Sequence, residues 1–297
     1  MKTYITKKIL EMVAVSEFKS GSLEVALEIR KVLKSDSQFK HLSKELDNNL
    51  LNDLSDFLDG TRTTNSTIQK HIDIFKSAEM KVQEALKQMS SGLATNPIRD
   101  IISIMKDSVA TFYVVGGTVR DVIANKDSND VDFCTGASLN TVRDIFNESD
   151  NFIVKETGKQ FLVLNVIHKA TKTSFEIAHF RKDKDNSGGV GGTMLEDSMR
   201  RDFTNSSLYY NINTKTLVDP LGNLGDALND ILRFNGDPDD RINEDPLRVI
   251  RFYKFIDRGF KPDNKSLKAV RRNFEKAINE VSKTRLMVEI EKIAGVK

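Results

Sequence analysis

The stretch FYVVGGTVRD at residues 112–121, followed by NDVDF at residues 129–133, decides the fold class of this chain. The apolar residues 112–115 predict a short buried strand, and Gly116 and Gly117 predict a turn from which a helix begins. Two glycines allow positive φ and let backbone N–H groups approach a phosphate, which the N-terminus of the next helix also favours. Taken alone, such a turn is more often only a turn.

Two acids follow in the second stretch. Asp130 and Asp132 alternate along a predicted strand, so their side chains share one face, with Cα atoms about 6 to 7 Å apart. Two carboxylates on one face repel each other unless a cation lies between them. This arrangement suits a two-metal site for phosphoryl or nucleotidyl transfer, with Asp130 and Asp132 as catalytic metal ligands. The alternative is an acidic strand edge that faces solvent.

Two later stretches add polar groups to this centre. In SFEIAHFR at 174–181, Glu176 alternates with apolar neighbours, and from an adjacent strand it can complete the acidic cluster as a third catalytic carboxylate. In RRDFTN at 200–205, the two arginines can pair with phosphates or anchor carboxylates. Asp202 and Asn205 can bond a sugar hydroxyl.

A last stretch, EDPLRVIRF at 244–252, predicts a helix with two acids at its positive end and two arginines spaced three residues apart, Arg248 and Arg251. One interpretation is structural, with Glu244 or Asp245 capping the helix. The other is functional. Asp245 and Arg248, one turn apart, would present an acceptor and donors to the edge of a base.

The segments around these motifs differ in pattern. Residues 1–95 are poor in Gly and Pro, and their apolar residues recur at helical spacing, which predicts a helical extension. Residues 96–217 alternate helices with short strands, and residues 218–297 are again helical. The predicted fold class is therefore α+β, a small mixed β-sheet flanked by helices and followed by a helical neck.

Composition excludes several classes of protein. The single cysteine, Cys134, has no partner for an internal disulfide, and the four histidines offer no zinc-ligand spacing. Cys134 is expected to be a small core residue. No apolar run reaches the length of a membrane span, and the N-terminus lacks a signal-peptide pattern, so we expect a cytoplasmic protein with no membrane partner.

The net charge of +2 hides an asymmetry. Residues 246–297 carry 14 Lys and Arg against 6 Asp and Glu, a balance of +8, whereas residues 1–245 sum to −6. A basic C-terminal arm favours a polyanionic partner. The alternative is a solvated helix face.

In order and spacing, six motifs resemble those of the class II CCA-adding tRNA nucleotidyltransferases and the related bacterial poly(A) polymerases, over about residues 97–295. The motifs are GGTVRD (116–121), NDVDF (129–133), FEIAHFR (175–181), RRDFTNSSLYYN (200–211), VDPLGN (218–223) and NGDPDDRINEDPLRVIRF (235–252). The resemblance implies a head with the DNA-polymerase-β-like nucleotidyltransferase fold, followed by the neck.

The resemblance also implies roles for individual residues. Asp130 and Asp132 would hold two Mg²⁺ ions, and Arg201 and Asp202 would lie near the ribose. Asp245 and Arg248 would pair with the edge of CTP or ATP, with Glu244 holding Arg248 in place. Asp237 and Arg241 would form a hinge before that helix, and Arg285 and Glu289, in the family's last motif, are spaced for an i,i+4 pair. The candidate nucleotide-binding residues are Gly116, Gly117, Arg120, Arg201, Asp202, Asn205, Glu244, Asp245, Arg248 and Arg251.

The implied reaction is Mg²⁺-dependent addition of CCA, or part of it, to a tRNA 3′ end from CTP and ATP. The 3′-hydroxyl attacks the α-phosphate and pyrophosphate leaves. Within the enzyme class the alternative is a poly(A) polymerase that extends another RNA 3′ end with AMP, and outside it a catalytically inactive RNA-binding relative.

Three features depart from the family pattern. The chain ends eight residues after Glu289, where the family would continue into a body and tail that grip tRNA, and the extension at residues 1–95 is not part of the family plan. We expect that extension to replace the grip, or to serve a homo-oligomer or another partner. The stretch GKQF at 158–161 matches neither subfamily's signature.

Overall fold

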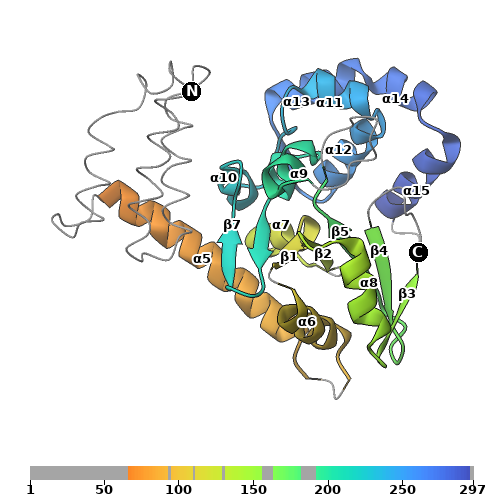
Figure 1. Ribbon diagram of the computed structural model, residues 1–297. Helices are drawn as coiled ribbons and strands as arrows, with labels where there is room; N and C mark the ends of the chain where they lie inside the picture. Colours follow the sequence, from red (N-terminus) through yellow and green to blue (C-terminus); the bar gives the residue numbers. More distant parts are fainter. Residues whose placement is uncertain are drawn as a thin grey trace, which may run out of the picture. The chain divides into compact units, whose positions relative to one another are not determined.

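The computed structural model describes residues 66–92, 95–109, 111–128, 131–155, 163–181 and 192–294 (Figure 1). The helices expected before residue 66, Asn129 and Asp130, and the stretch at 158–161 lie outside the described residues. The chain divides into two compact units, and in the described part the smaller one contains helix α5 up to Lys81 and strand β7 (Thr216–Val218). All other described residues belong to the larger unit.

Helix α5 (Ser66–Met89) confirms the helix expected from residue 68 to residue 89. Phe75, Ala78, Val82 and Leu86 are buried and recur at intervals of three or four residues, which is the spacing of one helix face. On the same helix, the Glu79 carboxylate accepts a hydrogen bond of 2.9 Å from the backbone N–H of Leu217 in β7. The carboxylate thereby satisfies a strand donor that would otherwise need water.

The larger unit is built on a mixed sheet with strands in the order β3-β4-β5-β2-β1-β6 (Figure 1). Strand β1 is antiparallel to β2 and to β6, whereas β2 is parallel to β5. The predicted α+β class with a small mixed sheet is therefore confirmed. The strand bounds are β1 Phe112–Val115, β2 Asp132–Thr135, β3 Phe152–Lys155, β4 Val163–His168, β5 Ser174–His179 and β6 Tyr209–Asn211.

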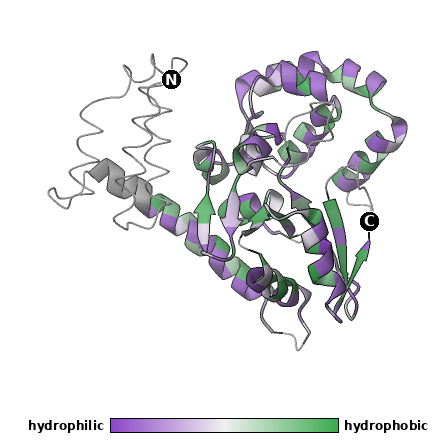
Figure 2. Ribbon diagram, in the orientation of Figure 1, coloured by the Kyte–Doolittle hydropathy of each residue, from purple (hydrophilic) through white to green (hydrophobic). Residues whose placement is uncertain are grey.

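One face of this sheet is apolar and covered by helices. Phe112 and Phe133 stack at 4.8 Å, and Phe146 of helix α8 (Leu139–Asn147) meets Phe152 of β3 edge-on at 5.2 Å. Helix α6 (Pro97–Ser108) begins at the predicted Pro97, where the Asn96 side chain accepts from the backbone N–H groups of Ile98 and Arg99. Figure 2 shows the hydrophobic residues concentrated on strands such as β4.

The neck surrounds a second core of aromatic side chains. Phe234 and Phe252 stack at 5.5 Å, and Phe203 packs against both. A short parallel pair, β8 (Ile231–Leu232) with β9 (Lys261–Pro262), adds a strand at 261–262 that the sequence pattern did not indicate. The helices are α10 Leu224–Leu228, α11 Pro238–Glu244, α12 Leu247–Asp257, α13 Asn264–Arg272, α14 Phe274–Glu280 and α15 Lys283–Ala294.

The helix predicted in the 244–252 stretch begins after both acids, and Asp245 is the one at its positive end, where Oδ1 accepts the backbone N–H of Leu247. Glu244 is the last residue of α11, and α12 begins at Leu247. Pro246 explains the break, because proline lacks the N–H that would continue the helix and forces the preceding residue out of the helical region. Asp245 is accordingly extended, with φ −148° and ψ 97°.

Candidate functional site

The glycine turn lies where β1 ends and helix α7 (Gly117–Ile123) begins. Gly116 has φ +62°, which confirms the expected positive φ, and a Cβ on this residue would lie 3.2 Å from Nη1 of Arg201. A Cβ on Gly117 would lie 3.5 Å from Nη2 of Arg120. The turn therefore brings the backbone close to two guanidinium groups, and a larger residue at 116 would be both strained and crowded.

Two of the predicted carboxylates lie side by side on the face of the sheet opposite the aromatic core. Phe133 pairs with Ile177 in the parallel β2–β5 ladder, so Asp132 lies next to Glu176, one residue earlier in the same register. Both residues are exposed, and neighbouring strands are about 4.8 Å apart. The structure thus brings Asp132 and Glu176 together as expected, whereas Asp130 is outside the described residues.

Carboxylate oxygens are the donors that Mg²⁺ prefers, so the chemistry of Asp132 and Glu176 fits a hard divalent cation. Within the described residues no group of three His, Cys, Asp or Glu side chains is close enough to hold a metal ion. A site at this place would need a further ligand besides these two, and Asp130 is the residue predicted to supply it.

Asp197 is the residue that the sequence analysis missed. It lies on helix α9 (Met194–Arg200), is 1% exposed and accepts hydrogen bonds from Arg200 (2.9 Å), Arg201 (2.8 Å) and the hydroxyl of Tyr209 (2.7 Å). Burial raises its pKa, but Arg201 and Arg200 outweigh burial and lower it to about 2. The spacing of Asp197 to the arginines, i,i+3 and i,i+4, was the signal that could have revealed it.

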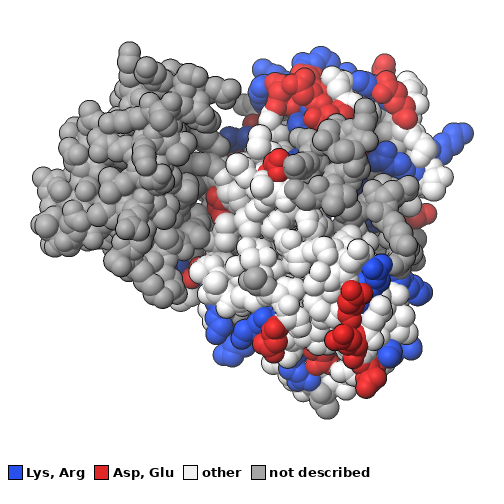
Figure 3. All heavy atoms as spheres, viewed as in Figure 1, with Lys and Arg blue, Asp and Glu red and all other residues white. Residues whose placement is uncertain are grey.

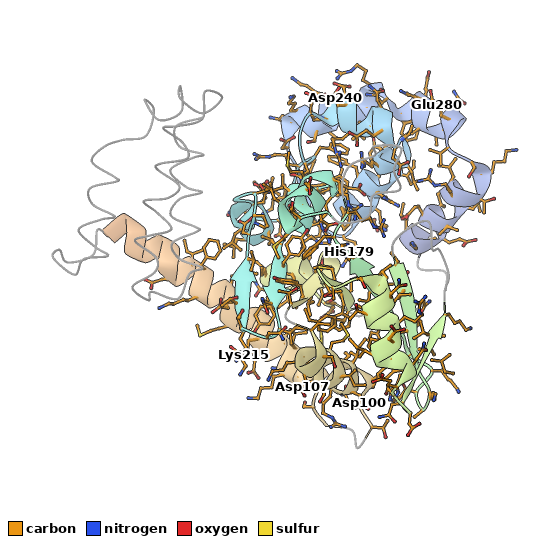
Figure 4. The ribbon with its side chains drawn as sticks, in the orientation of Figure 1. Asp100, Asp107, His179, Lys215, Asp240 and Glu280 are labelled. Carbon is orange, nitrogen blue, oxygen red and sulfur yellow. The ribbon has the colours of Figure 1, made fainter. Side chains whose placement is uncertain are left out.

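The surroundings of Asp197 are positively charged. Arg181, two residues after the end of strand β5, donates its backbone N–H to Asp197 (3.3 Å), and its side-chain Nε is buried and has no hydrogen-bond partner among the described residues. Burial and the neighbouring Arg200 lower the pKa of Arg181. Figure 4 labels His179 at the end of β5, two residues before Arg181. One carboxylate thus faces three guanidinium groups, a surplus that favours an anion such as phosphate.

Asp202 joins the head to helix α12. Its two oxygens accept from Nε of Arg248 (2.6 Å) and Nη1 of Arg251 (2.8 Å). Burial raises the pKa of Asp202, but Arg251 and Arg248 lower it below the usual value. Asp202 is therefore bonded to Arg248 and Arg251, two candidate nucleotide-binding residues of the neck. Its expected place near a ribose stays a prediction.

The predicted base-reading residues also meet at this junction. Glu244 accepts from Nη1 of Arg248 (2.7 Å), the contact expected if Glu244 holds that arginine in place. Asp245 is bonded to Arg285, whose Nη2 is 3.1 and 3.0 Å from its two oxygens. The predicted pair between Arg285 and Glu289 is wrong.

Glu289 instead faces helix α12. It accepts from Lys254 (2.8 Å) and Arg251 (3.4 Å) because it is 5% exposed on the inner side of α15, whereas Arg285 lies on the outer side. Arg251 thus lies between Asp202 and Glu289. The two acids fix an arginine that was predicted to bind nucleotide.

Two other predicted nucleotide-binding residues are buried. Arg120 is 3% exposed, gives Nε and Nη2 to Asp121 and Nη1 to Ser206, and lies 4.4 Å over the ring of Phe255. Asn205 is fully buried and donates to the carbonyl of Ile231. Both side chains connect the head to the neck, and direct contact with a nucleotide stays a prediction for each.

Six of the 14 Lys and Arg residues of the basic arm form ion pairs with acids that precede the arm in the sequence. Besides the contacts above, Arg258 binds Asp121 (2.8 Å), Lys265 binds Asp237 (2.8 Å) and Arg272 binds Asp239 (2.5 Å). Figure 3 shows acidic side chains flanked by basic ones over α11 and α13. These ion pairs neutralise part of the charge asymmetry along the sequence.

The chain is similar to several known nucleotidyltransferases. Residues 112–233 match the family model described as the poly(A) polymerase head domain. The chain is similar to a CCA-adding enzyme of Pediococcus pentosaceus (30% identical over 203 residues, covering 66% of this chain and 49% of the relative). It is also similar to a CC-adding tRNA nucleotidyltransferase of Shouchella clausii (33% over 182 residues, 61% and 43%).

A solved structure shares the fold. The crystal structure of the Bacillus stearothermophilus CCA-adding enzyme in complex with CTP matches with a TM-score of 0.59 and 27% identity, covering 68% of this chain and 49% of that one. The chain thus spans about half the length, or less, of the curated relatives that it matches.

Proposed function

We propose that this chain, whose residues 112–233 form a poly(A) polymerase head domain related to the CCA-adding enzymes, is a template-independent RNA nucleotidyltransferase. The observation that carries the proposal is the juxtaposition of Asp132 and Glu176 on adjacent strands of that head, on the face opposite its aromatic core. The arginines around Asp197 and the turn at Gly116 supply the cationic surroundings that a triphosphate needs.

In this proposal Asp130 and Asp132 hold two Mg²⁺ ions, and Glu176 completes the acidic cluster. When bound, the ions would neutralise charge that develops on the phosphates and favour attack by an RNA 3′-hydroxyl on the α-phosphate, with loss of pyrophosphate. In this proposal Arg201 binds the triphosphate, because its guanidinium group lies beside the turn at Gly116.

We further propose that the substrates are CTP, ATP and a tRNA 3′ end. The Watson–Crick edges of cytosine and adenine both offer an amino donor beside a ring-nitrogen acceptor. A carboxylate at Asp245 and a guanidinium at Arg248 complement that order, whereas uracil and guanine present a carbonyl beside a ring N–H. Within the described part of the chain, Nη2 of Arg248 makes no hydrogen bond, which leaves one donor for the base.

An incorporation assay tests this proposal. Purified protein, tRNA ending before the CCA sequence and Mg²⁺ would be incubated with each labelled NTP. We expect CMP and AMP to be added in a short tail, with UMP and GMP excluded. Addition of CMP without AMP would identify a CC-adding enzyme. Addition of AMP without CMP would identify an A-adding enzyme.

A poly(A) polymerase is the second candidate. Poly(A) polymerase I of Salmonella typhi is 31% identical over 160 residues, covering 48% of this chain and 33% of the relative. Long tails of A alone, added without any C, would establish that activity and exclude CCA addition. No incorporation with any NTP would instead favour an inactive RNA-binding relative.

The remaining expectations are part of the same proposal. A head at 96–217 and a neck at 218–297 would carry the reaction in the cytoplasm, and the extension at 1–95 would bind RNA, a second copy or another partner. Among the described helices, none is long and apolar enough to span a membrane.

A further inference from the structure

The ion pair between Arg285 and Asp245 joins two parts of the neck that are 40 residues apart in the sequence. Nη2 of Arg285, in the first turn of α15, lies between the two carboxylate oxygens, 3.1 Å from Oδ1 and 3.0 Å from Oδ2. Oδ1 also accepts the backbone N–H of Leu247 at 3.2 Å. Arg285 and the Leu247 N–H together restrain the orientation of the carboxylate, and because Oδ1 accepts two hydrogen bonds and Oδ2 one, a lone pair on Oδ2 remains available.

Stability of the fold does not explain this pair. The Arg285 side chain is 52% exposed and that of Asp245 is 23% exposed, and exposed ion pairs contribute little to folding. The neighbouring arginines of α12 are bonded to other acids, Arg248 to Asp202 and Glu244, and Arg251 to Asp202 and Glu289. Among the described residues, Arg285 is the cation that is bonded to the Asp245 carboxylate.

We propose that Arg285 is a positioning residue that sets nucleotide specificity by fixing the orientation of the Asp245 carboxylate. The proposal rests on the proposed function, in which Asp245 reads the base. It adds a residue that lies outside the predicted set of nucleotide-binding residues.

The physical reason lies in what a loose carboxylate can accept. A fixed Asp245 meets the amino group of cytosine or adenine while Arg248 meets the adjacent ring nitrogen. A carboxylate held by the Leu247 N–H without Arg285 is less restrained, and it can also accept the ring N–H of uracil or guanine if the base shifts by one position along its edge. Fixing Asp245 therefore penalises the wrong bases more than it strengthens binding of the right ones.

Arg285→Ala tests this role. We expect the preference for CTP and ATP over UTP and GTP to fall about tenfold, the order by which one good base-edge pair separates right from wrong bases. KM for CTP should rise while kcat changes little, because the catalytic carboxylates are untouched. Arg285→Lys should retain most of the preference, since a single nitrogen makes both contacts.

Arg272→Ala is the matched control. Arg272 also forms an exposed ion pair, with Asp239 on α11, at side-chain exposures of 62% and 40%. Equilibrium binding of each of the four NTPs with Mg²⁺, and misincorporation with a tRNA primer, would be measured for all variants. The control should match the wild type.

The outcomes separate the two proposals. Wild-type selectivity in Arg285→Ala, or the same loss in Arg272→Ala, overturns the role of Arg285 and leaves the proposed function standing. Failure of the wild-type protein to bind or incorporate any of the four nucleotides overturns the proposed function and, with it, the role of Arg285.

Discussion

Asp132→Asn is expected to reduce nucleotide incorporation by about a thousandfold while leaving the fold intact. The substitution removes the charge of one of the two described carboxylates on the site face and keeps its size. A metal-ion clamp contributes several kcal/mol to transition-state stabilisation, and each 1.36 kcal/mol corresponds to about tenfold in rate. Asp132 is exposed at the start of β2, so its replacement should not disturb the core.

Single-turnover incorporation of CMP and AMP is the measurement, with a circular dichroism melt to verify folding. Asp107→Asn is the matched control, because Asp107 is also an exposed aspartate but lies on helix α6 (Figure 4). It should retain wild-type activity. If Asp132→Asn keeps more than about a tenth of the wild-type rate, a catalytic role for Asp132 is wrong.

Local patterns made most of the fold predictable. The strand at Phe112–Val115, the glycine turn and the helix that follows depend on neighbouring residues alone, and the structure has all three. Asn96 and Pro97 marked the start of α6 for the same reason. Cys134 is 1% exposed, as expected for a small core residue.

The face on which Asp132 lies was predictable, because alternation along a strand fixes the face of each side chain. Its partner strand was not, since a parallel register between β2 and β5 depends on residues more than 40 positions apart. The sequence indicated that Glu176 can complete the cluster, and the ladder shows it beside Asp132. The local alternation of residues determines which face of the sheet a side chain lies on, whereas long-range packing determines which strand lies next to it.

Charge pairing was the least predictable part of the site. Spacing along a helix favoured Arg285 with Glu289, but tertiary packing turns Arg285 to Asp245 and Glu289 to Lys254. The i,i+4 preference contributes only about 0.2–0.5 kcal/mol, so packing of α15 against α12 overrides it. The same packing pairs six of the 14 cations of the basic arm with acids elsewhere in the chain.

Asp197→Asn is expected to lower the free energy of unfolding by about 3 kcal/mol at pH 7. The variant leaves Arg200 and Arg201 facing a neutral amide in a site where Asp197 is 1% exposed, and removing one partner of a buried pair costs about 3–5 kcal/mol. Arg200 and Arg201 are themselves partly exposed and can recover some hydration, which favours the lower end of this range.

The pH dependence gives this prediction its sign. The folded-state pKa of Asp197 is about 2, below the unfolded value of about 3.9, so its stabilisation is fully present above about pH 4 and is lost as pH falls through about 2. The difference between wild type and Asp197→Asn should therefore shrink between pH 4 and pH 2. Urea unfolding at a series of pH values, from pH 7 downwards as far as both proteins fold, is the measurement.

Asp239→Asn is the control, because Asp239 pairs with Arg272 at the surface, where an ion pair contributes about 0–1 kcal/mol. Equal destabilisation by the two substitutions would show that burial of Asp197 adds nothing to its ion pairs. A difference between wild type and Asp197→Asn that stays constant from pH 7 to pH 2 would show that the carboxylate charge is not what the two arginines require. The expected result is a large destabilisation by Asp197→Asn that becomes smaller as the pH falls towards 2. It would show that the buried charge of Asp197 holds Arg200 and Arg201 in place, and Arg201 lies beside Gly116.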